Sequence, residues 1–411
     1  MVEQFIIEQL KEYTFRITIY LFLSIFSIFI LSLIIHYIRK AISKLKSKKA
    51  QRYYSIIYDF ILDKIRLKEL QKKKLKKTIL TDVFVKIISI IVGEKQLKLK
   101  NAVKELELIE VIEKGLHSIL PSKRVKACYL LGLLGMKEHS RLLIPALRDY
   151  NPRVISSAII ALGEIRDINT VPEIISILPF CLEAHAWLIS AVLPFFGPDI
   201  YEFIKPYLKA NILHERKLIL LIKVVSNLRI AHSIRDLENI YLNTESLDVK
   251  IAALNAIGKI NDVISIKIVF NALNDKTWEI RAVAANIVGS MSLKGASSRL
   301  IPLLNDKSWY VRRNAANALA KMGKLGIYTL LNYMNQKDKF ARDMIAQTLE
   351  ETGVVDKALV DIQSEDPKIK KDAEYIIKML IQHGYVKYLE NYKNQIPHVD
   401  ELIEKKEKIR I

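Results

Sequence analysis

A repeat of 31 residues constrains this chain more than any other feature of its sequence. Residues 274–291 read NDKTWEIRAVAANIVGSM, and residues 305–322 read NDKSWYVRRNAANALAKM. The two copies share an Asp, a Trp, an Arg and a pair of Ala at matching positions. A fixed period between 20 and 50 residues predicts an array of supersecondary units that stack on one another.

The repeat extends well beyond these two copies. One position, which we call the anchor and which is usually small, recurs every 30–32 residues, at Gly132, Gly163, Pro194, Ser226, Gly258, Gly289, Ala320 and Glu350. A degenerate ninth copy covers Ile369–Leu380. Around each anchor the apolar residues recur at helical spacing, and a second apolar run follows after a break. Each copy is therefore predicted to be a helix pair that buries its apolar face against the next pair.

This pattern resembles the HEAT-repeat family, in the short bacterial form found in bilin-lyase-like repeats. The resemblance rests on an Asp followed by a hydrophobic residue five positions later and a basic residue six positions later, as in Asp275, Ile280 and Arg281. It covers roughly Leu116–His383 and departs most in the third and fourth copies. It implies an all-α fold, a right-handed α-solenoid of about eight to nine HEAT-like helix pairs. HEAT-like arrays serve many unrelated functions, so the resemblance does not name an activity.

An apolar run precedes the repeats. Ile17–Ile38 comprises 22 residues without Lys, Arg, Asp or Glu. As a helix it would span roughly 33 Å, enough to cross a hydrocarbon layer of about 30 Å. The alternative is a cleaved signal peptide, but the run is long, no small-residue cleavage site follows it, and the preceding residues carry no positive excess. We therefore predict one uncleaved transmembrane helix.

The segment after this run is strongly basic. Arg39–Lys104 holds 20 Lys plus Arg against 5 Asp plus Glu. The positive-inside rule then places the repeats in the cytoplasm at the inner membrane, with the N-terminus outside. The candidate residues for binding anionic lipid are Lys44, Lys46, Lys48, Lys49 and Arg52, within a membrane-facing segment of residues 39–77. The alternative is a topology signal on a solvated helix, and basic charge alone does not separate lipid from nucleic acid.

Two apolar stretches lie within this basic segment. The residues Tyr53, Tyr54, Ile57, Ile61 and Ile65 form a stripe that could lie along the inner leaflet. Ile79–Val92 is too short and too charged to span a membrane, so we expect a helix that caps the first repeat.

The resulting domains are 1–16 (N-terminal tail), 17–38 (transmembrane helix), 39–104 (basic juxtamembrane helices), 105–392 (solenoid) and 393–411 (charged C-terminal cap).

The sequence carries no catalytic signature. It lacks G-x-S-x-G, Walker, H-E-x-x-H and G-x-G-x-x-G motifs, and its eight histidines are scattered. Cys128 and Cys181 have no pairing or metal-type spacing, so we expect two small buried hydrophobic residues. We predict no enzyme activity, no catalytic or metal-ligating residues and no cofactor.

The candidate partner-binding residues are Trp278, Trp309, Arg313, Lys321, Phe180 and Phe195. The two tryptophans could form an aromatic ridge, or they could pin a loop onto the next repeat. The repeated Asp and Arg residues are interpreted as a structural ladder, whereas Arg313 and Lys321 are not demanded by the repeat. Pro194 at an anchor predicts a kink or an altered superhelix. The third and fourth copies are strongly apolar, either because the repeat drifted or because they form a docking groove for a partner helix. Trp187 is expected in the core.

These observations favour a non-enzymatic adaptor, anchored in the membrane, whose solenoid holds a protein partner near the inner membrane. That partner could itself be a membrane complex. One alternative is nucleic-acid binding, although only about +6 of the net charge of +20 lies beyond residue 104. Another alternative is an enzyme of the bilin-lyase-like class, which no cysteine or acidic cluster supports.

Overall fold

The computed structural model describes residues 2–385, except 74, 211, 292, 293 and 337, together with 387 and 389. Every regular element in this described part is helical. The chain divides into two compact units, unit 1 (Met1–Ile165) and unit 2 (Arg166–Ile411). The predicted C-terminal cap at 393–411 lies outside the described residues, as does most of the second helix expected at Tyr385–Tyr392.

Unit 1 begins with a single helix of 60 residues, α1 (Val2–Ile61). The remaining elements of this unit are α2 (Leu67–Lys72), α3 (Lys77–Ile88), α4 (Glu94–Glu105), α5 (Ile109–Leu116), α6 (Pro121–Leu134), η1 (Lys137–Leu143), η2 (Pro145–Arg148) and α7 (Pro152–Ile165). Helix α3 lies where a capping helix was predicted, and it contacts α5 and the first repeat helix α6.

The last turns of α1 belong to the core of unit 1. Tyr53, Ile57 and Ile61 are at most 9% exposed, and this part of α1 packs against α3. The Tyr53 hydroxyl also accepts a hydrogen bond from the backbone N–H of Lys76 at 2.9 Å. The expectation that this stripe lies along the lipid leaflet is therefore wrong, because α3 covers it.

Unit 2 contains the greater part of the repeat array. Its elements are η3 (Ile168–Thr170), α8 (Val171–Ser176), α9 (Glu183–Val192), η4 (Leu193–Phe196), η5 (Pro198–Ile200), α10 (Tyr201–Lys209), α11 (Glu215–Asn227), η6 (Ala231–Ser233), α12 (Ile234–Asn243), α13 (Leu247–Ile260), α14 (Val263–Ala272), α15 (Trp278–Met291), η7 (Lys294–Ala296), α16 (Ser297–Leu300), η8 (Ile301–Asn305), α17 (Trp309–Lys321), α18 (Lys324–Tyr333), α19 (Lys339–Glu351), α20 (Val354–Asp361) and α21 (Pro367–Gln382).

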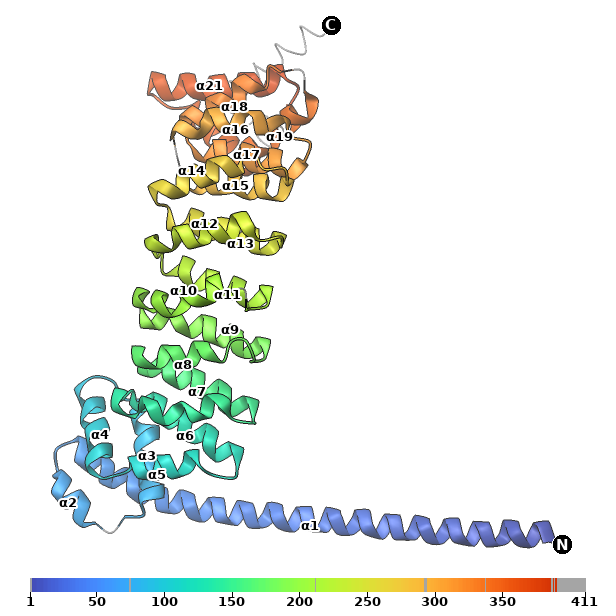
Figure 1. Cartoon of the computed structure of the whole chain (residues 1–411), viewed down its shortest axis with the longest axis vertical. Coiled ribbons are helices and arrows are strands. Elements are labelled where there is room, and N and C mark those ends of the chain that lie inside the picture. The colour runs from blue at the N-terminus through green and yellow to red at the C-terminus, as the bar shows by residue number, and fades with distance from the viewer. Residues whose placement is uncertain are drawn as a thin grey trace. The chain divides into compact units, whose positions relative to one another are not determined.

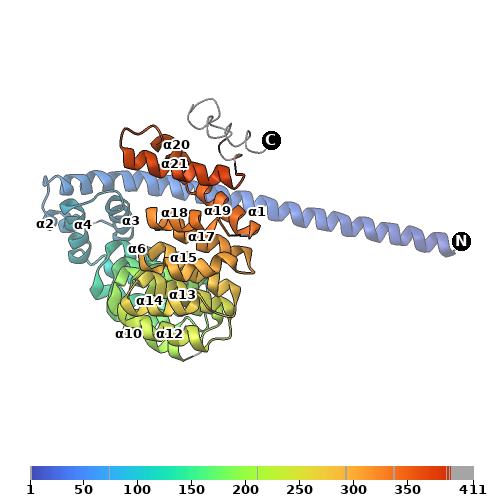
Figure 2. The ribbon, with the colours of Figure 1, turned by 90° about the horizontal axis from the view of Figure 1, so that it is seen from above.

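The helices of unit 2 form two rows. One row consists of the helices that carry the anchors, here called first helices: α9, α11, α13, α15, α17 and α19 pack in that order. The second helices α8, α10, α12 and α14 form the adjacent row. Figures 1 and 2 show the two rows side by side along the stack. The predicted all-α solenoid of helix pairs is confirmed.

The anchors allow first helices to approach each other closely. A Cβ atom added at Gly289 would lie 2.7 Å from the Cα of Ala318 on the next first helix. In unit 1, a Cβ atom at Gly132 would lie 2.8 Å from the Cα of Ala161. Real Cβ atoms do not approach backbone so closely, so a side chain at either anchor would force the two helices apart.

Buried ion pairs link successive repeats within each unit. Arg281 Nε donates to Asp306 Oδ2 at 2.7 Å, and its Nη2 donates to Asp306 Oδ1 at 3.0 Å. Arg124 holds Asp149 in the same way in unit 1, with distances of 2.7 and 2.9 Å. Each aspartate also accepts a hydrogen bond from the backbone N–H two residues later. The predicted Arg–Asp ladder is therefore confirmed at Arg281 and Asp306, whereas Asp275 accepts a hydrogen bond from the Tyr241 hydroxyl at 3.1 Å instead.

The ladder changes the acidity of its carboxylates. The hydrogen bonds from Arg124 lower the pKa of Asp149. Burial raises the pKa of Asp306, but the hydrogen bonds from Arg281 and from the Ser308 backbone outweigh it, so the net shift is downward. Both aspartates are therefore held as anions by the fold.

We predict that Gly289→Val destabilises unit 2, because the new side chain meets the α17 backbone. Overpacking of this kind costs about 1–3 kcal/mol, which should lower the melting temperature by several degrees in a calorimetric scan. Gly295→Ala is the matched control, since nothing lies within 4 Å of its added Cβ. Equal melting temperatures for the two variants would contradict the close approach.

We predict that Asp306→Asn costs about 2–3 kcal/mol near pH 7, because it removes a charge-assisted bidentate contact in a mostly buried site. The lowered pKa means that the stabilisation is present above the ordinary Asp value of 3.8 and is lost as pH falls through the folded-state pKa. The melting-temperature difference between wild type and variant should therefore shrink below about pH 4. Glu183→Gln in the exposed Arg216 pair is the control, with little expected effect. A difference that persists at low pH would contradict the assignment.

Candidate partner-binding face

Three of the predicted partner-binding residues lie on α17. Trp309 and Arg313 are four residues apart and share one face near its first turn, whereas Lys321 lies in the last turn, about 120° around the helix axis from Trp309. The Arg313 guanidinium lies 5.0 Å from the centre of the Trp309 ring, which confirms that they are neighbours on this face. Lys321 is exposed at the C-terminal end. We call the surface formed by these positions of α17 and by the equivalent positions of α13 and α15 the first-helix face.

Aromatic side chains cross from α15 to α17 at the start of these helices. The Trp278 ring stacks on Tyr310 at 5.3 Å, and Tyr310 meets Trp309 edge to face at 5.2 Å. Trp278 and Trp309 remain about two-fifths exposed, and Tyr310 is 58% exposed. We call these three residues the aromatic edge. Trp278 therefore pins one repeat to the next, as one hypothesis expected, and the ridge for a partner stays a prediction.

Arginines continue this edge toward α19. Arg313 Nη2 donates to Glu351 at 2.9 Å, so Arg313 is tied to the next first helix rather than free as the sequence suggested. Arg312 lies 5.9 Å from the exposed ring of Phe340. Its buried Nε has no hydrogen-bond partner within the described part of the chain. The ladder aspartate is missing here, because Gln336 takes its place in the next repeat.

Sequence reasoning missed a column of asparagines on the same face. Asn255, Asn286 and Asn317 each lie three residues before an anchor, on α13, α15 and α17. The first two are exposed and the third is half-buried. None of the three side chains makes a hydrogen bond to another described residue. The repeat register could have revealed them, because they occupy the same position in three consecutive copies.

The two predicted phenylalanines lie elsewhere in unit 2. Phe180 precedes α9 and is 91% exposed, while Phe195 lies in η4 with its ring 5.4 Å from the Arg166 guanidinium. Pro194 has the expected effect, since α9 ends at Val192 and a 3-10 turn follows. Trp187 was expected in the core, but it is 62% exposed. That prediction was wrong because Trp187 falls on the outward side of α9.

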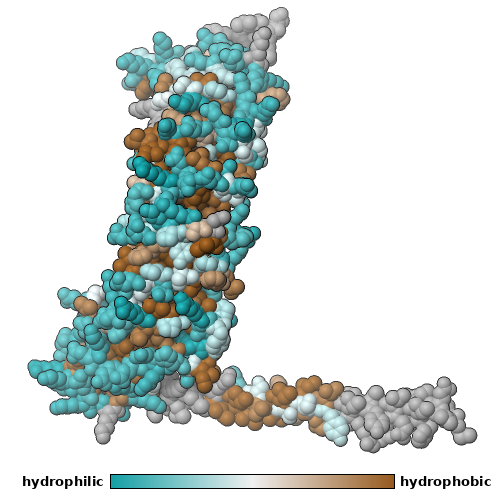
Figure 3. Space-filling view, in the orientation of Figure 1, coloured by the Kyte–Doolittle hydropathy of each residue, from teal (hydrophilic) through white to brown (hydrophobic). Residues whose placement is uncertain are grey.

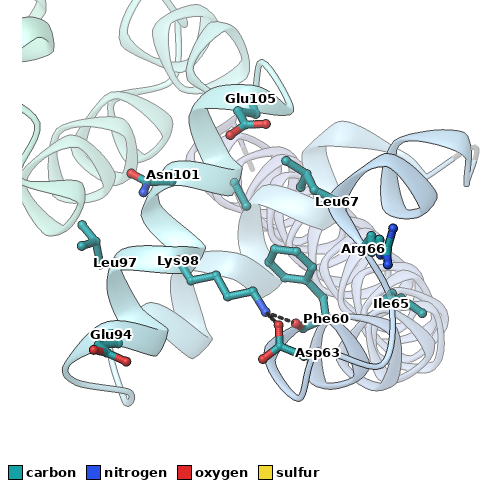
Figure 4. A pocket seen from close by; sticks show the side chains of 11 residues that line it. Phe60, Asp63, Ile65, Arg66, Leu67, Glu94, Leu97, Lys98, Asn101 and Glu105 are labelled. Carbon is teal, nitrogen blue, oxygen red and sulfur yellow. Dashed lines mark hydrogen bonds and ion pairs between the residues drawn. The ribbon is translucent and has the colours of Figure 1, made fainter.

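A cavity of about 790 Å³ lies in unit 1, between the end of α1 and α4. Figure 4 shows Lys98 reaching from α4 toward the end of α1, where its Nζ donates to the Phe60 carbonyl at 2.6 Å and to Asp63 at 2.5 Å. No feature of the sequence had pointed to this cavity. Lys98 also lies over the Phe60 ring, so it joins α4 to the end of α1.

The apolar run of α1 is open to its surroundings. All side chains of Tyr20–Ile38 are exposed, and their mean hydropathy is 2.4. Figure 3 shows this apolar surface along α1. By length and composition the segment could cross a membrane once. Of the candidate lipid-binding residues, Arg52 is exposed, whereas the side chains of Lys44, Lys46, Lys48 and Lys49 lie outside the described residues.

Of the two cysteines, which were both expected to be buried, only Cys128 is. Cys128 is fully buried, and burial raises the pKa of its thiol to about 12. Cys181 is half-buried, and burial raises the pKa of its thiol too. Among the described residues, no group of three or more His, Cys, Asp or Glu side chains could hold a metal ion.

Residues 298–325 match a family model described as HEAT repeat, which supports the HEAT-like character of the array. No curated protein matches the chain in sequence. Among solved structures, Kap121p bound to Nup53p is 14% identical, with a TM-score of 0.46, over 81% of this chain and 45% of that chain. This chain therefore spans less than half the length of Kap121p.

Two further solved structures have the same kind of similarity. The complex of CpcE and CpcF of phycocyanin lyase from Nostoc sp. PCC7120 is 15% identical, with a TM-score of 0.29, over 59% of this chain and 94% of that chain. Human deoxyhypusine hydroxylase is 14% identical, with a TM-score of 0.25, over 67% and 96%. At these values, none of the similarities indicates a shared activity or partner.

Proposed function

We propose that this chain is a non-enzymatic scaffold that α1 anchors in the inner membrane and that binds a protein partner on the first-helix face of unit 2. The aromatic edge is the observation that carries the proposal. Trp, Tyr and Arg are the residue types that dominate binding energy at protein interfaces, and Trp and Tyr bury large areas at low cost in side-chain entropy. Here they gather at one edge, partly exposed, on a rigid pair of helices.

The rigidity of the edge supports this role. Trp278, Tyr310 and Trp309 contact one another across α15 and α17, and the Arg281–Asp306 pair fixes the same two repeats. A partner would therefore meet side chains whose positions are already set. Preorganisation of this kind reduces the entropy lost on binding.

The continuity of α1 supports the anchor. The apolar run ends at Ile38, and the same helix enters the core of unit 1 at Tyr53. About 15 helical residues separate the two, which corresponds to roughly 22 Å. In this proposal, a helix holds unit 1 at a short distance from the cytoplasmic surface. The basic segment 39–77 faces the anionic leaflet there, and the N-terminus lies outside.

The anchor can be tested on the full chain. Phe26→Arg combined with Phe29→Arg places two charges in the apolar run, each costing about 2.5–3.5 kcal/mol at the centre of a bilayer. The variant should move from the carbonate-resistant membrane pellet to the supernatant. Leu62→Arg, at an exposed site just beyond α1, is the control and should stay in the pellet. Wild-type protein released by alkaline carbonate would contradict a transmembrane anchor.

The binding face can be tested on protein extracted from its own membranes in mild detergent. The wild type should retain one protein partner in fixed proportion. Trp309→Ala combined with Tyr310→Ala should reduce that retention at least tenfold, as expected for residues that each contribute 1–2 kcal/mol or more. Leu242→Ala, at a 64% exposed site on the second helix α12, is the control. Loss of the partner in the control alone, or full retention in the edge variant, would contradict the assigned face.

A further inference from the structure

The asparagine column has no structural explanation within unit 2. Asn is a poor residue for a helix interior, because its side chain competes for backbone hydrogen bonds, and Ala, Lys or Glu would suit an exposed site better. Other asparagines here have a visible role: Asn314 donates to the Ala282 carbonyl at 2.8 Å. Asn255, Asn286 and Asn317 make no such bond, so their amides are available to a ligand.

The chemistry of the column suits a peptide backbone. Each amide offers donors and an acceptor side by side, which complements the N–H and C=O groups of a peptide unit. Packed helices lie about 8–10 Å apart, so successive amides in the column recur at about that interval. A polyproline II segment rises about 3.1 Å per residue with three residues per turn, so it presents the same backbone group about every 9.3 Å. The spacing of the amides and the spacing of the backbone groups therefore match.

An extended β-strand matches less well. Its backbone groups face the same side every second residue, at about 6.7 Å, which falls short of the spacing between packed helices. A polyproline II segment also has no internal hydrogen bonds, so its N–H and C=O groups are free to meet the amides. The geometry therefore favours this backbone conformation.

Charge near the column favours an acidic segment. Lys259 and Lys321 lie one turn after Asn255 and Asn317, about 6 Å further along the helix axis. The acidic residue Asp248 lies about 10 Å from Asn255 in the other direction, so the cations are the nearer charges. Lys321 is exposed, and Lys259 donates to Asn227 at 2.7 Å while remaining exposed.

We propose that Asn255, Asn286 and Asn317 bind the backbone of an acidic, proline-rich partner segment in the polyproline II conformation. Lys259 and Lys321 pair with its carboxylates, and the aromatic edge borders it. This inference rests on the proposed function, because it names the class of segment that the first-helix face holds.

The test uses the full-length protein in detergent and a fluorescein-labelled (Glu-Pro-Pro)5 peptide, with binding followed by anisotropy. The wild type should bind this probe at least tenfold more tightly than (Lys-Pro-Pro)5, which reverses the charge. It should also bind the probe at least tenfold more tightly than the flexible (Glu-Gly-Ser)5, which keeps the charge but not the conformation. Equal affinity for the three probes would overturn the proposal.

The triple variant Asn255→Ala/Asn286→Ala/Asn317→Ala separates binding from folding. Ala is the better helix former, so the melting temperature should stay the same or rise. Affinity for (Glu-Pro-Pro)5 should nevertheless fall by roughly 10- to 100-fold, as expected for a few lost hydrogen bonds. Unchanged affinity would overturn the role of the column.

The same triple variant distinguishes this inference from the proposed function. If the variant keeps the native partner while Trp309→Ala/Tyr310→Ala loses it, the asparagine column is not the binding element and the aromatic edge remains so. If neither variant affects the partner, both proposals fail.

Discussion

The close contact between first helices determines the rest of unit 2. Gly289 lies so near Ala318 that a single added carbon would meet backbone at 2.7 Å. Contact at that range leaves no room for slippage, so successive first helices repeat the same register. The Arg281–Asp306 pair fixes the two repeats at their N-terminal ends. As a result, residues at one position of the repeat recur on successive first helices.

These recurring positions give the surface its chemistry. The surface has an aromatic edge at the first turns of α15 and α17, amides in the middle of α13, α15 and α17, and cations at the last turns of α13 and α17. No single helix offers enough area for a stable interface, which usually needs about 800 Å² per partner. Three helices held in register present a longer continuous surface. A linear array of this kind suits an extended partner segment better than a compact small molecule.

Much of this architecture could be predicted from the sequence. The 31-residue period predicted the helix pairs, the anchors and the Arg–Asp ladder, because all three follow from one repeated pattern. The length and composition of the apolar run likewise predicted a helix able to cross a membrane. All of these features depend on local sequence, and the pattern of the repeat recurs in several copies.

Features that depend on neighbouring elements were harder to predict. The stripe through Tyr53 and Ile57 was assigned to lipid because its apolar residues can be seen in the sequence. The packing of α3 over this stripe cannot be seen there. Trp187 was assigned to the core on residue type alone, although its position on α9 faces outward. The asparagine column was missed because exposed polar residues look like ordinary surface. Its register in three consecutive copies can be read from the sequence, but the absence of local hydrogen bonds among the described residues cannot.

In our proposal, the first-helix face of unit 2 binds the partner at the membrane. The most direct measurement is photo-crosslinking in intact cells, from a benzophenone amino acid that replaces Ser290 beside the asparagine column. Asn271 on the second helix α14 provides the matched exposed control site. We expect one discrete adduct from position 290, found in the membrane fraction, and none from position 271. An adduct from position 271 with none from position 290 would place the binding surface on the other row and contradict the account.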